Sequence, residues 1–341
     1  MLNIYDIAER SGFSIATVSR VLNRSPNVSP KTRDKILAVM REEDYTPNAF
    51  ARGLGLNTMR MIGILCTDIS DTYYARAVSL VENCLRRKGF DALLCCTGTS
   101  LEEKKKYLNV LLAKRVDAVI LIGSAFKENT DNSHIETAAQ QVPIMIINGL
   151  VELPNTYCVL CDEGAAAYDN ISLLCSRGHR RILYLYDVLT YSGCVKMEGY
   201  KKALEKNGIA FDPALLVQTP KSIEGAQKSV EELFCSQVEF TAVMASEDLL
   251  AVGALKALKA RGISMPVVGF NNSVIAEAST PALTSVDNRL DSLCPTAVDM
   301  LTDLLSGGEI PKKIVIPARL VERESLHVSD ELSSLLLNPG K

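Results

Sequence analysis

Six residues near the N-terminus, spaced along one predicted helix, have the chemistry to contact DNA base edges and phosphates. They are Ile15, Ala16, Thr17, Ser19, Arg20 and Asn23. Their methyl groups suit the thymine methyl, and their hydroxyl, guanidinium and amide groups can hydrogen-bond base edges or phosphates in a major groove. Because Ile15 and Ala16 carry no polar side-chain group, little direct base readout can be inferred, and the DNA sequence contacted stays open.

The segment 4–23 predicts the two short helices that would position these residues. Apolar residues recur at helical spacing on both sides of a Gly-Phe pair, first at Ile4, Ile7 and Ala8 and then at Ala16, Val18, Val21 and Leu22. Ala8 is small enough for a second helix to cross closely, Gly12 can adopt the positive φ of a tight turn, and Ser14 can cap the second helix. The pattern is typical of a helix-turn-helix, although a helical hairpin of purely structural role would show the same spacing.

A third helix is predicted to pack against the first two. Ser29 can cap it and Pro30 suits its first position, while its apolar stripe is formed by Ile36, Leu37 and Met40. At its end, Asp44 stands where glycine would be the easy choice for a left-handed cap, and Asp tolerates that conformation better than most residues.

The charge distribution agrees with a DNA-binding N-terminus. Residues 1–60 carry nine Lys or Arg against six Asp or Glu, whereas the remaining residues carry 28 against 34. A basic segment in an otherwise acidic chain provides attraction to phosphates. The margin is small, so it supports the DNA interpretation without establishing it.

A short segment, YTPNAFARGLGL at residues 45–56, follows the third helix. A helix of this length that contains Gly53 and Gly55 is marginal in water and forms fully only when something packs against it.

Three motifs together resemble the lactose-repressor and galactose-repressor (LacI/GalR) family of bacterial transcription factors: DIAxxxGxSxATVSRVLN, VSPKTRDKI and YTPNAFARGL. The resemblance is collinear from residue 2 to about residue 325. It implies an all-α three-helix headpiece whose second helix enters the major groove of double-stranded operator DNA, and a hinge helix that folds on that DNA. In a homodimer two leucines would wedge into the minor groove, and Leu54 occupies that position here, with Asn48 and Ala51 in the same contact set. The alternative for Leu54 is an ordinary linker residue.

Beyond Met61, apolar runs alternate with longer amphipathic segments, which predicts parallel sheets covered on both faces by helices. The predicted strands are MIGILCT, DALLCC, AVILI, PIMIIN, RILYLY, TAVMA and VVGF, and the predicted helices span 72–88, 101–114, 164–177, 196–207, 224–235 and 249–261. A break near residues 157–164 divides them into two α/β lobes.

The resemblance implies that these lobes form a periplasmic-binding-protein-like core. The expected divisions are a headpiece and hinge at 1–57, a core at 58–330 and a tail at 331–341. Within the core, the N-lobe would comprise about 61–159 plus 289–317 and the C-lobe about 162–285 plus 320–330. The chain would cross between them near 159–162, 285–289 and 317–320.

Ligands of such folds lie at the carboxyl ends of the strands. Transferring the family's pocket onto this chain implies a small-molecule effector site formed by Tyr73, Tyr74, Ser124, Asn148, Lys196, Glu247, Asn271 and Asn288. Amides stand where family members often have Asp, and Lys196 stands where Arg is usual, so the bidentate grip on sugar hydroxyls is weakened. We therefore expect an anionic or small polar effector, such as a sugar phosphate, with merely solvated cleft residues as the alternative.

Several other functions are disfavoured. The sequence has no glycine-rich phosphate loop between a strand and a helix, and His134, His179 and His327 lack the spacing of metal or catalytic sites, so we expect no enzyme, no metal and no cofactor. An α/β enzyme or a sugar-binding protein with an accessory helical domain remains the alternative. No apolar run is long enough for a membrane, and no leader precedes the first helix, so we expect a cytoplasmic protein.

The ten cysteines are expected to be mostly buried thiols, including Cys66, Cys95 and Cys96 in apolar runs. Cys158 and Cys161 have the spacing of a redox or metal pair. Because residues i and i+3 of a strand point to opposite faces, we interpret both as structural.

Overall fold

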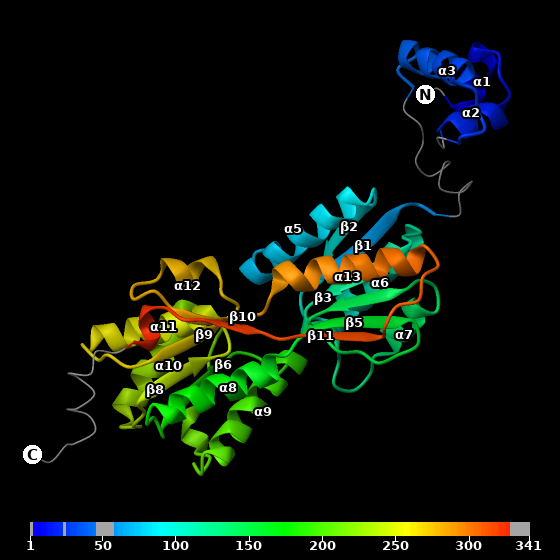
Figure 1. The fold of residues 1–341 in the computed structure, drawn as a ribbon. Helices are drawn as coiled ribbons and strands as arrows, with labels where there is room; N and C mark the ends of the chain where they lie inside the picture. Colours follow the sequence, from blue (N-terminus) through cyan, green and yellow to red (C-terminus); the bar gives the residue numbers. More distant parts are fainter. Residues whose placement is uncertain (1–2, 23–24, 46–57, 328–341) are drawn as a thin grey trace, which may run out of the picture.

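The computed structural model describes residues 3–22, 25–45 and 58–327 (Figure 1). Its N-terminal unit packs α1 (Ile4–Ser11), α2 (Ile15–Leu22) and α3 (Pro30–Glu42) around one small core. The core residues come from all three helices and the loop before α3: Ile7, Ala8, Val18, Val21, Val28, Ile36 and Met40. Leu37 was expected in this stripe, but its side chain is exposed, because it lies to one side of the face defined by Ile36 and Met40.

The turns of this unit follow the predicted chemistry. Gly12 ends α1 with a φ of 72°, and Asp44 follows α3 with a φ of 47°. The Ser14 hydroxyl accepts the Thr17 N–H at 3.2 Å and so caps α2. The structure adds a capping box at α1, where the Asp6 carboxylate accepts the Asn3 N–H at 2.7 Å.

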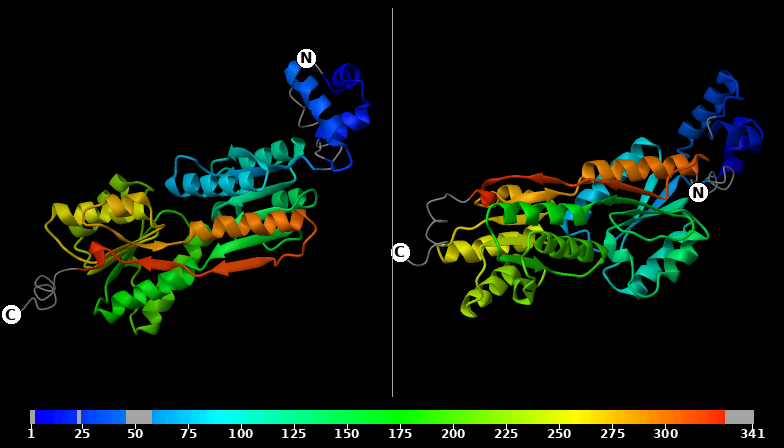
Figure 2. Two further views of the ribbon diagram at one scale, coloured as in Figure 1. Left: turned by 45° about the horizontal axis from the view of Figure 1, so that its top comes forward. Right: turned by 60° about the horizontal axis from the view of Figure 1, so that its bottom comes forward.

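The rest of the described chain forms two lobes, each built on a six-stranded sheet (Figures 1 and 2). The N-lobe sheet is parallel throughout and has the order β11-β5-β4-β3-β1-β2. Its strands are β1 (Met61–Cys66), β2 (Asp91–Cys96), β3 (Ala118–Ile122), β4 (Ile144–Ile147), β5 (Thr156–Cys161) and β11 (Lys313–Ile316).

The C-lobe sheet has the order β12-β10-β9-β8-β6-β7, and only β12 pairs antiparallel among its described strands. Its strands are β6 (Ile182–Tyr186), β7 (Leu216–Gln218), β8 (Ala242–Ala245), β9 (Val267–Phe270), β10 (Thr284–Asp287) and β12 (Arg319–Val321).

Helices cover both faces of each sheet, as continuous apolar strands require. In the N-lobe, α5 (Thr72–Arg87) and α13 (Leu290–Leu305) pack on one face, and α6 (Leu101–Ala113) and α7 (Ser133–Ala139) pack on the other. In the C-lobe, α8 (Glu163–Ser176) and α9 (Tyr191–Lys206) pack on one face, and the opposite face is covered by α10 (Ile223–Cys235), α11 (Asp248–Ala260) and α12 (Val274–Ala278). Short 3₁₀ turns occur at Ser124–Phe126, Pro213–Leu215 and Glu324–Leu326.

The chain passes between the lobes at three places, which brings three connecting segments together. The first follows β5 and precedes α8 at Asp162, the second lies at 288–289 between β10 and α13, and the third lies at 317–318 between β11 and β12. The predicted break near 157–164 is therefore mostly strand, since β5 completes the N-lobe sheet up to Cys161.

Some predicted elements were misplaced or missed. The helix expected to begin at Lys196 begins at Tyr191, because the Thr190 hydroxyl caps it. The short or partly exposed elements α7, β7, α12, β11 and β12 were not predicted, nor were β10 and α13.

The cysteine predictions were partly right. Cys158 and Cys161 are buried on opposite faces of β5, one in the core beneath α6 and α7 and the other beneath α13. Cys96 was expected to be buried but is exposed; it is the last residue of β2, which is an edge strand. Its neighbour Cys95 is half-buried.

Candidate functional site

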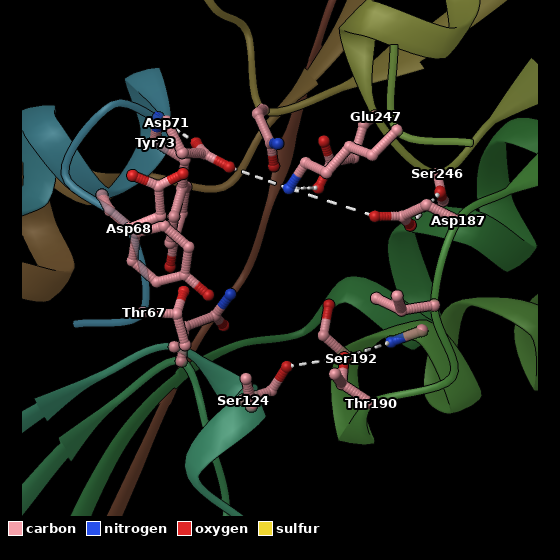
Figure 3. Close-up of a pocket in the computed structure, with 18 of the residues that line it drawn as sticks. Thr67, Asp68, Asp71, Tyr73, Ser124, Asp187, Thr190, Ser192, Ser246 and Glu247 are labelled. Atoms are coloured by element: carbon pink, nitrogen blue, oxygen red, sulfur yellow. Dashed lines mark hydrogen bonds and ion pairs between the residues drawn. The ribbon is translucent and has the colours of Figure 1, made fainter. Parts of the chain in front are cut away.

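A cleft of about 410 Å³ lies between the two lobes, a volume in the range of small-molecule sites. Residues that follow strands of both sheets line it, as parallel α/β folds predict. From the N-lobe come the loop after β1 and the residues after β3 and β4, and from the C-lobe come the residues after β6 and β8 (Figure 3).

Seven of the eight predicted effector residues line this cleft: Tyr73, Tyr74, Ser124, Asn148, Lys196, Glu247 and Asn271. Asn288 does not, and its predicted place in the lining was wrong. It is buried behind the wall, where its Nδ2 donates to Asn271 Oδ1 at 3.0 Å, because β10 ends beneath the loop after β9. Asn288 thus orients the amide of Asn271 from outside the cleft.

Two aromatic side chains form the N-lobe wall. Tyr73 and Tyr74 stand edge to face with ring centroids 5.3 Å apart at the start of α5. Gly123 makes room for them, since a Cβ at this position would lie 2.7 Å from the Tyr74 ring, and its φ of 100° also disfavours a side chain.

A network of hydrogen bonds between cleft-lining side chains joins the two lobes. Asn148 Nδ2 donates to Glu163 Oε1 at 3.1 Å, and the Ser192 hydroxyl donates to Glu163 Oε2. Nearby, the Ser124 hydroxyl bonds Thr190 Oγ1 at 2.9 Å, as Figure 3 shows. Glu163 is buried, and both of its oxygens are satisfied by protein groups.

The Lys196 ammonium interacts with groups of the protein itself. Its Nζ donates to the Ser246 carbonyl at 3.0 Å and lies 4.5 Å from the centroid of the Phe270 ring, and the residue is buried. The sequence placed Lys196 in the pocket, but these partners leave its charge poorly available to an anion.

Asp187 was not predicted, yet it lines the cleft and holds a buried oxygen that lacks a hydrogen-bond partner among the described residues. It is 8% exposed, and its Oδ1 accepts the Ser246 hydroxyl at 3.3 Å. Its Oδ2 accepts no hydrogen bond from any described residue, and its nearest cation, Lys221 Nζ, is 4.0 Å away. A buried carboxylate oxygen with unmet capacity favours a ligand that donates a hydrogen bond.

Lys221 also lines the cleft and was not among the predicted site residues. Its Nζ lies 2.8 Å from Asp71 Oδ2 and 2.8 Å from Glu247 Oε1. Burial opposes its charge, but Glu247 and Asp71 outweigh burial and raise the pKa of Lys221.

The cleft is acidic overall. Its lining holds five carboxylates, namely Asp68, Asp71, Glu163, Asp187 and Glu247, and two ammonium groups, Lys196 and Lys221. Burial raises the pKa of Glu247 to about 7, and the charge of Asp187 acts in the same direction, although Lys221 opposes both. The site therefore disfavours anionic ligands, whereas the sequence led us to expect an anionic or small polar effector.

Two of the missed lining residues share one signal. Asp187 follows the run RILYLY, and Ser246 follows TAVMA, so both are the first polar residues after a buried strand. Thr190, Ser192 and Lys221 lie next to helix starts, where sequence alone does not show that they face the cleft.

The predicted DNA-contacting face of α2 is open. Ile15, Ala16 and Arg20 are exposed, and Thr17 and Ser19 are half-buried, with Thr17 Oγ1 bonded to Ser14 Oγ at 2.9 Å. Asn23, Asn48, Ala51 and Leu54 lie outside the described residues.

Other candidate sites are weak within the described part of the chain. No group of three or more His, Cys, Asp or Glu residues described in the structure could hold a metal ion. His179 Nδ1 forms a hydrogen bond with Thr241 Oγ1 at 3.1 Å. None of the helices described is both long and apolar enough to cross a membrane.

Comparisons with known proteins match both parts of the chain. The family model described as bacterial regulatory proteins, lacI family, matches residues 3–48, and that of the periplasmic binding protein-like domain matches residues 171–326. An HTH-type transcriptional regulator of Lachnoclostridium phytofermentans is 46% identical over 330 residues, which cover 95% of this chain and 99% of the relative.

Two solved structures are similar over nearly the whole chain. The Lac repressor dimer bound to operator and the anti-inducer ONPF gives a TM-score of 0.84 at 25% identity, covering 96% of this chain and 99% of that one. The cellobiose complex of the transcriptional regulator CelR gives 0.70 at 25% identity, covering 95% and 100%. The similarity thus includes the three-helix unit and the two-lobed core.

Proposed function

The chain belongs to the lacI family of bacterial regulatory proteins and is a DNA-binding transcriptional regulator, and we propose that it represses transcription under the control of a small molecule held between its lobes. The observation that carries this proposal is the cleft, whose polar lining comes from both sheets. A ligand that touches both lobes binds one inter-lobe arrangement better than another and so shifts the population between them. We assign the chain no catalytic role.

The ligand class we propose is a neutral, hydroxyl-rich molecule such as a sugar. The carboxylate of Asp187 lines the cleft and has an oxygen without a hydrogen-bond partner among the described residues, which suits a hydroxyl donor, and the tyrosines supply an apolar wall. The sugar phosphate expected from the sequence is less favoured, because Lys196 and Lys221 are already paired and carboxylates outnumber them. The similarity to a cellobiose-bound regulator is consistent with this choice.

On the DNA side, we propose a homodimer that binds a two-fold operator with one headpiece on each half-site. The α2 residues Ile15, Ala16, Thr17, Ser19, Arg20 and Asn23 would enter the major groove, and Asn48, Ala51 and Leu54 would contact the minor groove. The similarity to a repressor dimer on its operator supports this arrangement.

We propose that residues 1–57 bind DNA, that residues 58–330 bind the ligand and form the dimer contacts, and that residues 331–341 form a tail. Ligand binding would change the angle between the lobes and thereby the distance between the two hinge segments of the dimer. The hinge segments could then fold together on DNA in one state and not in the other.

A screen in two steps tests the proposal. Thermal unfolding of the full chain is measured with neutral sugars, amino sugars and sugar phosphates, and each stabilising compound is then added to operator selected from a random DNA pool. We expect neutral sugars to stabilise and to change operator affinity. Stabilisation by sugar phosphates alone would contradict the ligand class, and failure to select any DNA would contradict the function.

A further inference from the structure

Lys221 connects the two lobes across the cleft. Its Nζ contacts Glu247 Oε1 of its own lobe at 2.8 Å and Asp71 Oδ2 of the N-lobe at 2.8 Å. Among the ion pairs of residues 3–22, 25–45 and 58–327, Lys221–Asp71 is the only one that joins the lobes. In Figure 3, Asp71 faces Glu247 and Asp187 across the pocket, and the dashed lines between them converge on one ammonium.

The backbone fixes both ends of this contact. Lys221 stands between Pro220 and Ser222, whose hydroxyl accepts the Gly225 N–H at 2.9 Å and caps α10. On the other side, Asp71 caps α5, since its Oδ1 accepts the Tyr73 N–H at 2.8 Å and leaves Oδ2 for the ammonium. Each partner is therefore presented from a capped helix start.

The Lys221 ammonium offsets the negative charge of carboxyl groups from both lobes. Three carboxylates surround it, with Asp71 on one lobe and Asp187 and Glu247 on the other. Their side chains are at most 19% exposed, so water screens them only in part. Removing the ammonium would leave the carboxylates of Asp71 and Asp187 facing each other across the cleft. Among the described residues, the remaining side-chain hydrogen bonds between the lobes are Ser124–Thr190 and Asn148–Glu163.

We propose that Lys221 is a latch that holds the lobes closed when the cleft contains no ligand. This inference rests on the function proposed above and adds a built-in regulator to the same site. A ligand must fit beneath the closed latch or displace the ammonium from Asp71. The Lys221–Asp71 pair thereby sets the operator affinity of the ligand-free protein. A ligand that breaks this pair changes that affinity.

Four variants of the full chain test the latch. Lys221→Met removes the charge at similar length, and Asp71→Asn breaks the same pair but keeps a helix-capping side chain. Lys221→Arg preserves the charge. The matched control is Lys228→Met, since Lys228 is an exposed lysine of α10 that pairs with Glu232 within one lobe. Operator affinity is measured without added ligand, and backbone hydrogen exchange is measured at residues 67–74 and 187–193 without DNA.

We expect Lys221→Met and Asp71→Asn to change operator affinity about tenfold in the same direction, a size typical of coupling between sites. The double variant should exceed neither single change, because both break one interaction. Both should also speed exchange at the cleft segments, while Lys221→Arg and Lys228→Met stay within about twofold of the parent chain.

Other outcomes overturn the latch. These are unchanged exchange in both cleft segments of Lys221→Met and Asp71→Asn, or effects on operator affinity that add in the double variant. If the parent chain binds no selected DNA, the proposed function fails, and the exchange measurement still decides whether the latch exists.

Discussion

Replacing Glu247 with Gln should change how the stability of this protein depends on pH. Burial raises the pKa of this carboxyl from 4.5 to about 7, so the native state retains its proton between those values while the unfolded chain has lost it. The unfolding free energy therefore falls as pH rises through this window. Asp248, the next residue, adds a slope of the same sign, since burial raises its pKa to about 6.

The size of the effect follows from the pKa of Glu247. Each tenfold change in proton affinity is worth about 1.4 kcal/mol, so ionising Glu247 in the native state costs on the order of 3 kcal/mol. Gln mimics the neutral carboxyl and does not ionise. The stability of the variant relative to the parent chain should therefore rise by up to that amount between pH 4.5 and pH 8.

Urea unfolding followed by circular dichroism is the suitable assay, because the chain has no tryptophan. Midpoints are compared at pH 4.5, 5.5, 6.5 and 8 for the parent chain, Glu247→Gln and the control Glu232→Gln. Glu232 is an exposed carboxylate of α10, and its replacement should leave the slope unchanged. Parallel pH curves for the parent chain and Glu247→Gln would refute the idea that burial of this carboxyl controls the dependence.

Three further substitutions test the two binding surfaces. Arg20→Ala should weaken operator binding, and it should relax sequence preference only if Arg20 contacts a base, which binding to a panel of operator variants measures. Leu54→Ala should weaken operator binding at least tenfold and leave the thermal unfolding of the core unchanged; equal affinity would remove Leu54 from the contact set. Gly123→Ala should lower ligand affinity, because the added Cβ would lie 2.7 Å from the Tyr74 ring, and calorimetry that shows full affinity would mean that the Tyr74 wall is not part of the site.

Much of the fold could be predicted because its physical signals are local. The central strands are buried on both faces and are apolar throughout, so β1, β3 and β8 appear as continuous runs in the sequence. Edge strands lack this signal. In β2 exposure varies along the strand, and Cys96 is exposed although it ends the apolar run ALLCC.

The candidate site was predictable in position and less so in chemistry. Side chains that follow buried strands, such as Ser124 and Asn148, line the cleft because the topology places strand ends there. What their charges do depends on contacts between distant residues. The sequence does not show that Lys196 binds a backbone carbonyl, whereas Lys221 binds a carboxylate of the other lobe.

The central claim is that occupancy of the cleft controls DNA binding, and operator affinity with and without a bound ligand tests it most directly. A neutral sugar that stabilises the full chain is added at saturation, and the operator Kd is measured for the parent chain and for Asp187→Ala. We predict at least a fivefold change in Kd for the parent chain and a smaller change for the variant at the same sugar concentration. A sugar that binds the cleft with no change in operator Kd would contradict the account.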